Sequence, residues 1–134
     1  MDKNDINTLQ MVLLGIIEER NWSRLRDCLD RPPFIIAARS FKQNPSFYGA
    51  NILHLVLRNW PSRDIIKIII KRLPETLAEI DCTGRAPLHV AAGLGVNAKV
   101  VHEIARAYPR ACLIQDLDGE LRAVGRTYII RFLS

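Results

Sequence analysis

The chain has 134 residues, of which 49% are hydrophobic and 25% are charged, and its formal net charge is +5 at pH 7. This length suits one domain with a modest core, and the composition is near the balance of ordinary globular proteins. No apolar run approaches the roughly 18 residues of a membrane span, and the start Met1–Asp5 lacks the basic and apolar regions of a secretory signal. We therefore expect a protein of the cytoplasm or nucleus that is neither secreted nor embedded in a membrane.

Charge and cysteine content narrow the function classes. The segment before Gly49 carries 7 basic and 6 acidic side chains, residues 49–118 carry 9 and 7, and the last 16 residues carry 3 and 1. Because nucleic-acid binders concentrate their positive charge on one face, this thin spread argues against nucleic acid as the partner. The odd number of cysteines (Cys28, Cys82 and Cys112) indicates reduced thiols rather than a disulfide framework. Cys28 has the pattern of a core residue, and Cys82 falls in a loop.

The first third of the chain predicts two helices and a long connection. Apolar residues at helical spacing predict an amphipathic helix over Thr8–Glu19, with Asn7 as its N-cap. A second short helix is predicted over Trp22–Leu29, and Pro32–Pro33 is expected to end it. Residues 34–48 read as a long connection of mixed character.

The central part of the chain repeats itself. The string Gly-x-x-x-Leu-His recurs after 35 residues, and an Asp that precedes its glycine recurs with it. The repeated positions are Gly49, Leu53 and His54 with Gly84, Leu88 and His89, then Asp81 with Asp116, and Gly84 with Gly119. A period between 20 and 50 residues is typical of stacked supersecondary units, none of which can bury its apolar face alone.

Each repeat predicts two helices joined by a tight turn. In the first repeat the helices are Ile52–Leu57 and Asp64–Arg72. In the second they are Pro87–Ala92 and Ala98–Ala107, with a break at Gly93–Gly95. Proline after each second helix is consistent with a helix end at that point.

Residues 84–95, Gly-Arg-Ala-Pro-Leu-His-Val-Ala-Ala-Gly-Leu-Gly, resemble the ankyrin repeat, whose pattern is Gly-x-Thr-Pro-Leu-His-x-Ala-Ala-x-x-Gly. The ankyrin pattern marks the start of its first helix with a capping threonine followed by a proline, and each repeat of this chain keeps one of these two signals. In the first repeat Asn51 can act as the cap, but Ile52 replaces the proline. In the second repeat Pro87 is kept, but Ala86 replaces the threonine. The resemblance covers residues 46–119 and extends to residues 6–33 by helix-pair pattern alone. It implies an all-α fold, an ankyrin-repeat solenoid of stacked helix-turn-helix units with hairpin-like loops.

The resemblance implies a single domain over residues 1–134. Its parts are an N-terminal helix-pair cap (6–33), a long connection (34–48), a repeat (49–83), a second repeat (84–118) and a divergent C-terminal cap or truncated repeat (119–134). The repeat frame consists of Gly49, Leu53, His54, Asp81, Gly84, Pro87, Leu88, His89, Asp116 and Gly119. In ankyrin units the histidine hydrogen-bonds to loop backbone, so His54 and His89 are expected to be structural rather than metal ligands or catalysts.

No motif in the sequence points to catalysis. There is no zinc-ligand spacing, no phosphate-binding glycine loop and no nucleophile elbow. We therefore expect no enzymatic activity, no cofactor and no bound metal.

The resemblance implies a monomeric protein-binding module that uses its hairpin tips and concave helix face. The corresponding residues are Phe47, Tyr48, Arg58, Asn59, Cys82, Thr83, Arg85, Leu94, Leu117, Asp118 and Glu120. Aromatic and arginine side chains dominate interface energetics, which favours Phe47, Tyr48 and Arg85. Alternatively, Phe47 and Tyr48 pack beneath the 34–48 connection. Two other functions stay open: a basic surface that binds nucleic acid or an acidic partner, and a fragment of a longer array without independent function.

Overall fold

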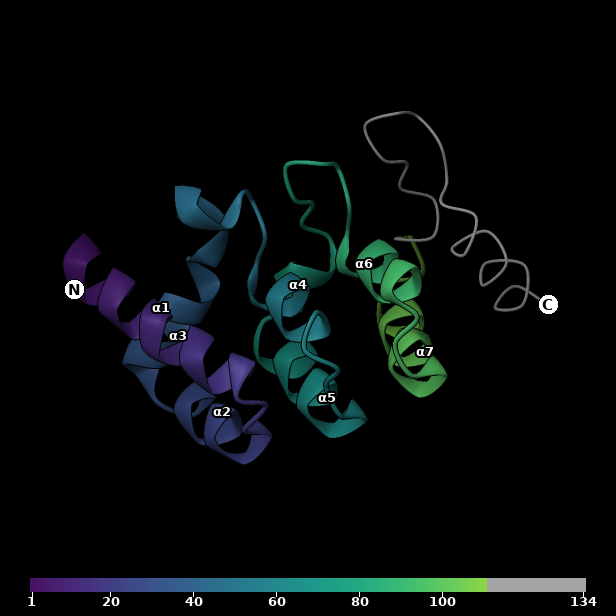
Figure 1. Cartoon of the computed structure of the whole chain (residues 1–134), viewed down its shortest axis with the longest axis horizontal. Helices are drawn as coiled ribbons and strands as arrows, with labels where there is room; N and C mark the ends of the chain where they lie inside the picture. Colours follow the sequence, from purple (N-terminus) through teal and green to yellow (C-terminus); the bar gives the residue numbers. More distant parts are fainter. Residues whose placement is uncertain (111–134) are drawn as a thin grey trace.

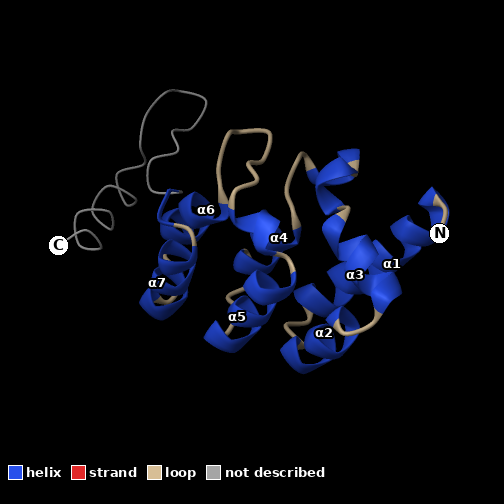
Figure 2. Cartoon of the chain, turned by 180° about the vertical axis from the view of Figure 1, so that it is seen from behind, coloured by secondary structure: helices blue, strands red, loops and turns tan. Residues whose placement is uncertain are grey.

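The computed structural model describes residues 1–110, and these residues are all-helical with no β-strand (Figures 1 and 2). The α-helices are α1 (Lys3–Glu18), α2 (Trp22–Leu29), α3 (Pro32–Arg39), α4 (Ile52–Leu57), α5 (Arg63–Arg72), α6 (Pro87–Leu94) and α7 (Ala98–Ala107). Three 3₁₀ turns, η1 (Phe41–Gln43), η2 (Pro45–Phe47) and η3 (Pro74–Leu77), lie between them. The expected C-terminal cap or truncated repeat at 119–134 lies outside the described residues.

The N-terminal part contains three helices rather than a helix pair and a long connection. Helix α2 ends before Pro32–Pro33 as predicted, but these prolines also begin α3, so the prediction of a connection from residue 34 was wrong. Proline has no N–H to lose in the first turn of a helix, and its fixed φ already suits helical geometry. Residues 34–48 are thus mostly helical, and α3 packs against both α1 and α2.

Helix α1 begins earlier than its apolar pattern predicts. Asp2, not Asn7, is the N-cap, and its side chain accepts a hydrogen bond of 2.9 Å from the Asp5 N–H. The first turn is largely exposed to solvent, so it carries no apolar periodicity that could have indicated the true start.

The next four helices form two consecutive pairs, and we call α4–α5 the first unit and α6–α7 the second unit. The predicted bounds of α4 and α7 agree with the structure, and those of α5 agree to within one residue. The predicted break at Gly93–Gly95 comes too early, since α6 continues through Leu94 and ends at Gly95, whose φ is +69°. A positive φ favours glycine, which therefore makes an effective helix stop.

The core runs through the stack from one helix pair to the next. Helix α4 packs on α6, α5 packs on α7, and α2 packs on α5, so the pairs lie side by side as in Figure 1. All six residues of α4 are buried, and Leu53, Ile66 and Leu73 are completely inaccessible. Burying each such side chain stabilises the fold by about 1.5–3 kcal/mol. Each unit therefore depends on its neighbours for the burial of its apolar faces.

One buried polar side chain ties the N-terminal helices together. The Nε2 of Gln10 in α1 donates to the carbonyl oxygen of Ala37 in α3 at 3.1 Å, and Asn44 Nδ2 donates to Gln10 Oε1 at 2.8 Å. Gln10 is 1% exposed, so these bonds replace those that its amide would make with water.

Candidate interaction surface

His54 joins the first unit to the loop that leads into the second. Its imidazole is completely buried at the start of α4. The Asn51 N–H donates to Nδ1 at 3.1 Å, and Nε2 lies 2.8 Å from the carbonyl oxygen of Arg85. Both bonds form together when the proton is on Nε2, so we assign the neutral Nε2–H tautomer. Burial lowers the pKa of His54, an effect that the Arg85 carbonyl and the Asp81 charge oppose without cancelling.

His89 takes the equivalent place at the start of α6. Its Nδ1 accepts a hydrogen bond of 3.1 Å from the Ala86 N–H. The two helix starts differ in their caps: Asn51 Oδ1 accepts from the His54 N–H at 3.0 Å, but Ala86 has no side-chain oxygen and leaves α6 without a side-chain cap. Both histidines thus occupy buried, hydrogen-bonded positions at helix starts.

Asp81 organises the loop before α6. Its Oδ1 accepts from the Thr83 N–H (2.9 Å), the Thr83 hydroxyl (2.6 Å) and the Arg85 N–H (3.1 Å). The Asp81 N–H donates in turn to the Arg85 carbonyl at 3.0 Å, and Gly84 turns the chain with a φ of +77°. Partial burial alone would raise the pKa of Asp81, but the bonds from Thr83 and Arg85 outweigh it and the pKa is lowered. The carboxylate therefore closes the loop through three hydrogen bonds.

A backbone hydrogen bond joins this loop to the one before α4. The Cys82 N–H donates to the Tyr48 carbonyl oxygen at 2.9 Å. Gly49, whose φ is +80°, makes the approach possible, because a Cβ at this position would lie 3.0 Å from the Cys82 nitrogen. Tyr48 (74% exposed) and Cys82 are thereby held on neighbouring loops, both open to solvent.

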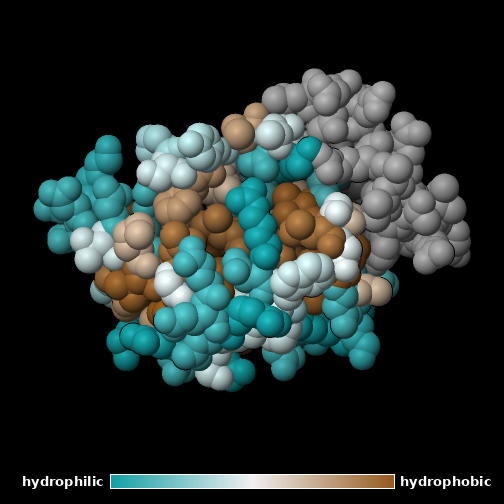
Figure 3. All heavy atoms as spheres, viewed as in Figure 1, coloured by the Kyte–Doolittle hydropathy of each residue, from teal (hydrophilic) through white to brown (hydrophobic). Residues whose placement is uncertain are grey.

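Beside these loops, a recess of about 160 Å³ lies between α4 and α6. Three of the predicted partner-binding residues line it: Arg58 after α4, Arg85 before α6, and Leu94 at the end of α6. Asp81, His89, Val90 and Gly93 complete the lining. In Figure 3, hydrophobic surface over α6 is separated by a hydrophilic strip from hydrophobic surface near α4. We call these seven lining residues the recess.

The charges in the recess are incompletely matched. It holds two guanidinium groups and one carboxylate, and that carboxylate already accepts the loop hydrogen bonds. The Nε atom of Arg85 is buried and has no hydrogen-bond partner within residues 1–110. Leaving a buried donor unsatisfied costs free energy, so a partner that supplied an acceptor here would gain from it.

The remaining predicted residues are dispersed. Asn59 is half-buried, and its Nδ2 donates to the Leu55 carbonyl oxygen at 3.0 Å at the end of α4. Thr83 is exposed, although its hydroxyl is engaged with Asp81. Phe47 is half-buried and packs edge-on against Phe41, with ring centroids 5.0 Å apart, so it belongs to the packing of the 34–48 segment. Leu117, Asp118 and Glu120, like the frame residues Asp116 and Gly119, lie outside the described residues.

The sequence prediction did not place Val90 or Asp81 on the interaction surface. Val90 is four residues before Leu94, and residues at this spacing share a helix face, so the helical period would have identified it. The place of Asp81 beside Arg58 depends on how α4 and α6 stack, and no local pattern encodes that arrangement.

The described residues give no sign of other chemistry. Across residues 1–110 no group of three or more His, Cys, Asp or Glu side chains is placed to hold a metal ion, and no helix there is long and apolar enough to cross a membrane. Cys28 is buried and Cys82 exposed, as expected. Comparisons with protein families, curated proteins and solved structures found no match.

Proposed function

We propose that residues 46–110 form an ankyrin-type solenoid and that the chain is a non-enzymatic module that binds another protein. Two features support the solenoid. The units α4–α5 and α6–α7 share one helix-turn-helix order at the 35-residue period, and the loop before each contains a glycine with positive φ, Gly49 or Gly84. The bonds from His54 and Cys82 to the neighbouring loops join consecutive units.

The observation that carries the binding proposal is the recess between α4 and α6. It brings Arg58, which follows α4, together with Arg85 and Leu94, which flank α6 and lie 27 or more residues further along the chain. Leu94 is 43% exposed and offers apolar contact, while the arginines offer charged donors. Such a combination suits a partner that presents an apolar side chain next to a carboxylate or carbonyl oxygen. Tyr48 extends the surface along the adjoining loop.

The test is affinity capture from lysate of the source cells, at low and high salt, with three forms of the full chain. The first is the natural chain, and the second is Arg58→Ala/Arg85→Ala/Leu94→Ala. The third is a control, Arg24→Ala/Arg26→Ala/Met11→Ala, which likewise removes two arginines and one large apolar side chain, here at exposed positions of α1 and α2. Circular dichroism verifies that all three are folded.

We expect at least one protein to be retained at both salt concentrations by the natural chain and the control, and to be lost with the recess variant. Retention of the same proteins by the recess variant would contradict the proposed surface. If no protein is enriched by the natural chain, the adaptor function itself is contradicted.

A further inference from the structure

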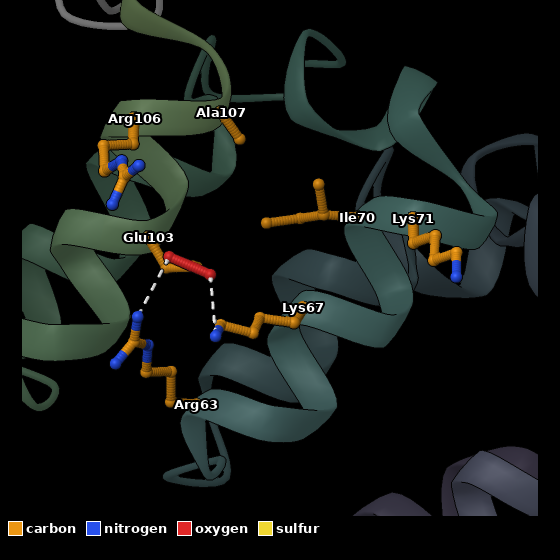
Figure 4. A pocket seen from close by; sticks show the side chains of 7 residues that line it. All are labelled: Arg63, Lys67, Ile70, Lys71, Glu103, Arg106 and Ala107. Atoms are coloured by element: carbon orange, nitrogen blue, oxygen red, sulfur yellow. Dashed lines mark ion pairs between the residues drawn. The ribbon is translucent and has the colours of Figure 1, made fainter.

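A second depression lies between the outer helices of the two units, α5 and α7. It has a volume of about 440 Å³ and is open to solvent. Ile70 projects into the space between the helices and Ala107 borders it, so part of the lining is apolar (Figure 4). The charged lining residues are Arg63, Lys67, Lys71, Glu103 and Arg106. We call this depression the basic groove.

The basic groove carries four cationic side chains and one carboxylate. Glu103 lies between Arg63 and Lys67, with an oxygen 3.8 Å from a nitrogen of each, and is 16% exposed (Figure 4). Within residues 1–110, Lys71 and Arg106 make no ion pair with any acidic side chain. Three positive charges therefore remain unbalanced along the groove.

The cationic side chains of the basic groove come from both helices that border it, α5 and α7. Arg63, Lys67 and Lys71 follow one another at four-residue spacing along α5; Arg63 and Lys67 extend towards Glu103, whereas the Lys71 ammonium at the end of the row points away from it (Figure 4). Arg106 belongs to α7 and faces the same space from the other side, with Ile70 between (Figure 4). An occupant of the groove therefore meets cations on two walls and apolar surface between them.

The excess of positive charge in the basic groove does not continue into the neighbouring depression. The depression between α2 and α5, about 170 Å³ in volume, contains one base and one acid, Arg26 and Asp64. Arg72, on the α2 side of α5, pairs with Asp30. A long polyanion such as nucleic acid would meet these carboxylates as it crossed the stack, whereas a short segment lying between α5 and α7 would not.

We propose that the basic groove binds an acidic, amphipathic protein segment, with carboxylates beside Lys71 and Arg106 and an apolar side chain over Ile70 and Ala107. This surface lies on the second helix of each unit, so it is separate from the recess formed at α4 and α6. The proposal does not depend on the recess, since the two sites have no lining residue in common.

The test measures fluorescence anisotropy with the full chain and three labelled probes of equal negative charge. The first probe is a peptide that alternates glutamate pairs with leucine, the second contains glutamate only, and the third is a single-stranded oligodeoxynucleotide. The groove variant is Lys71→Glu/Arg106→Glu. Its control, Arg24→Glu/Arg26→Glu, changes the net charge equally at exposed positions of α2.

We expect the leucine-containing peptide to bind the natural chain tightest. The groove variant should lower the affinity for this peptide by about tenfold or more, whereas the control should change that affinity by less than about threefold. Glu103→Gln removes the single carboxylate of the groove and should tighten binding by about threefold, which partial unfolding could not produce. The proposal is overturned if both double variants weaken binding equally, or if the glutamate peptide or the oligonucleotide binds as tightly as the leucine-containing peptide.

Discussion

Replacing His54 tests the connection between the two units. Alanine at this position would leave the buried Asn51 N–H without its acceptor, whereas the Arg85 carbonyl would keep the 3.0 Å bond from the Asp81 N–H. One unsatisfied buried donor costs about 1–3 kcal/mol, and the lost packing of a fully buried side chain adds to this. We therefore expect His54→Ala to lower the free energy of unfolding in urea by about 3 kcal/mol. A loss below about 1 kcal/mol would refute this reasoning.

The same residue predicts a pH dependence. Because burial lowers the pKa of folded His54 below the 6.5 of an unfolded histidine, the unfolded chain binds a proton more readily than the folded chain. The stability that His54 contributes is thus complete above pH 6.5 and falls as the pH drops below 6.5 towards the folded pKa, by at most about 1.4 kcal/mol per pH unit. His54→Gln, which cannot titrate, should show a shallower slope over this range. Equal slopes for the natural chain and His54→Gln would show that the imidazole is not held neutral by burial.

Three further outcomes are expected. Gly49→Ala should lower the free energy of unfolding by about 1–3 kcal/mol, because its Cβ would lie 3.0 Å from the Cys82 nitrogen at a φ of +80°; an unchanged urea midpoint would contradict the close approach of the loops. Ala86→Ser should stabilise the chain by about 0.5–2 kcal/mol, because its hydroxyl can cap α6, and a lower melting temperature would count against that geometry. In a Cys112→Ala background, a colorimetric thiol reagent should modify Cys82 at once and Cys28 only on unfolding, and equally fast reaction of both would contradict the burial of Cys28.

Local patterns in the sequence account for much of the fold. Helices α2, α4 and α7 have the predicted bounds, because in each helix a capping asparagine directly precedes the residues that carry the apolar pattern. Helix α3 was missed since proline is both a helix terminator and a favoured first residue, and only the packing of α3 on α1 decides between these roles at Pro32.

The candidate surfaces were less predictable than the helices. Arg58, Arg85 and Leu94 were each predicted from the sequence as partner-binding residues, but the recess that they share depends on the stacking of α4 on α6. The basic groove illustrates the same limit. The four-residue spacing of Arg63, Lys67 and Lys71 is visible in the sequence, yet an even spread of charge concealed it. The approach of Arg106 from α7 is a property of tertiary structure alone.

The hydrogen bonds from His54 to Arg85 and from Cys82 to Tyr48 connect positions 31 and 34 residues apart, slightly less than one period of 35 residues. Duplication of one whole period in the gene would therefore supply each donor with an equivalent acceptor in the new copy. An insertion of another length between the bonded positions would change this offset. Lengthening by complete periods is thus the route of evolutionary growth that this bonding pattern tolerates.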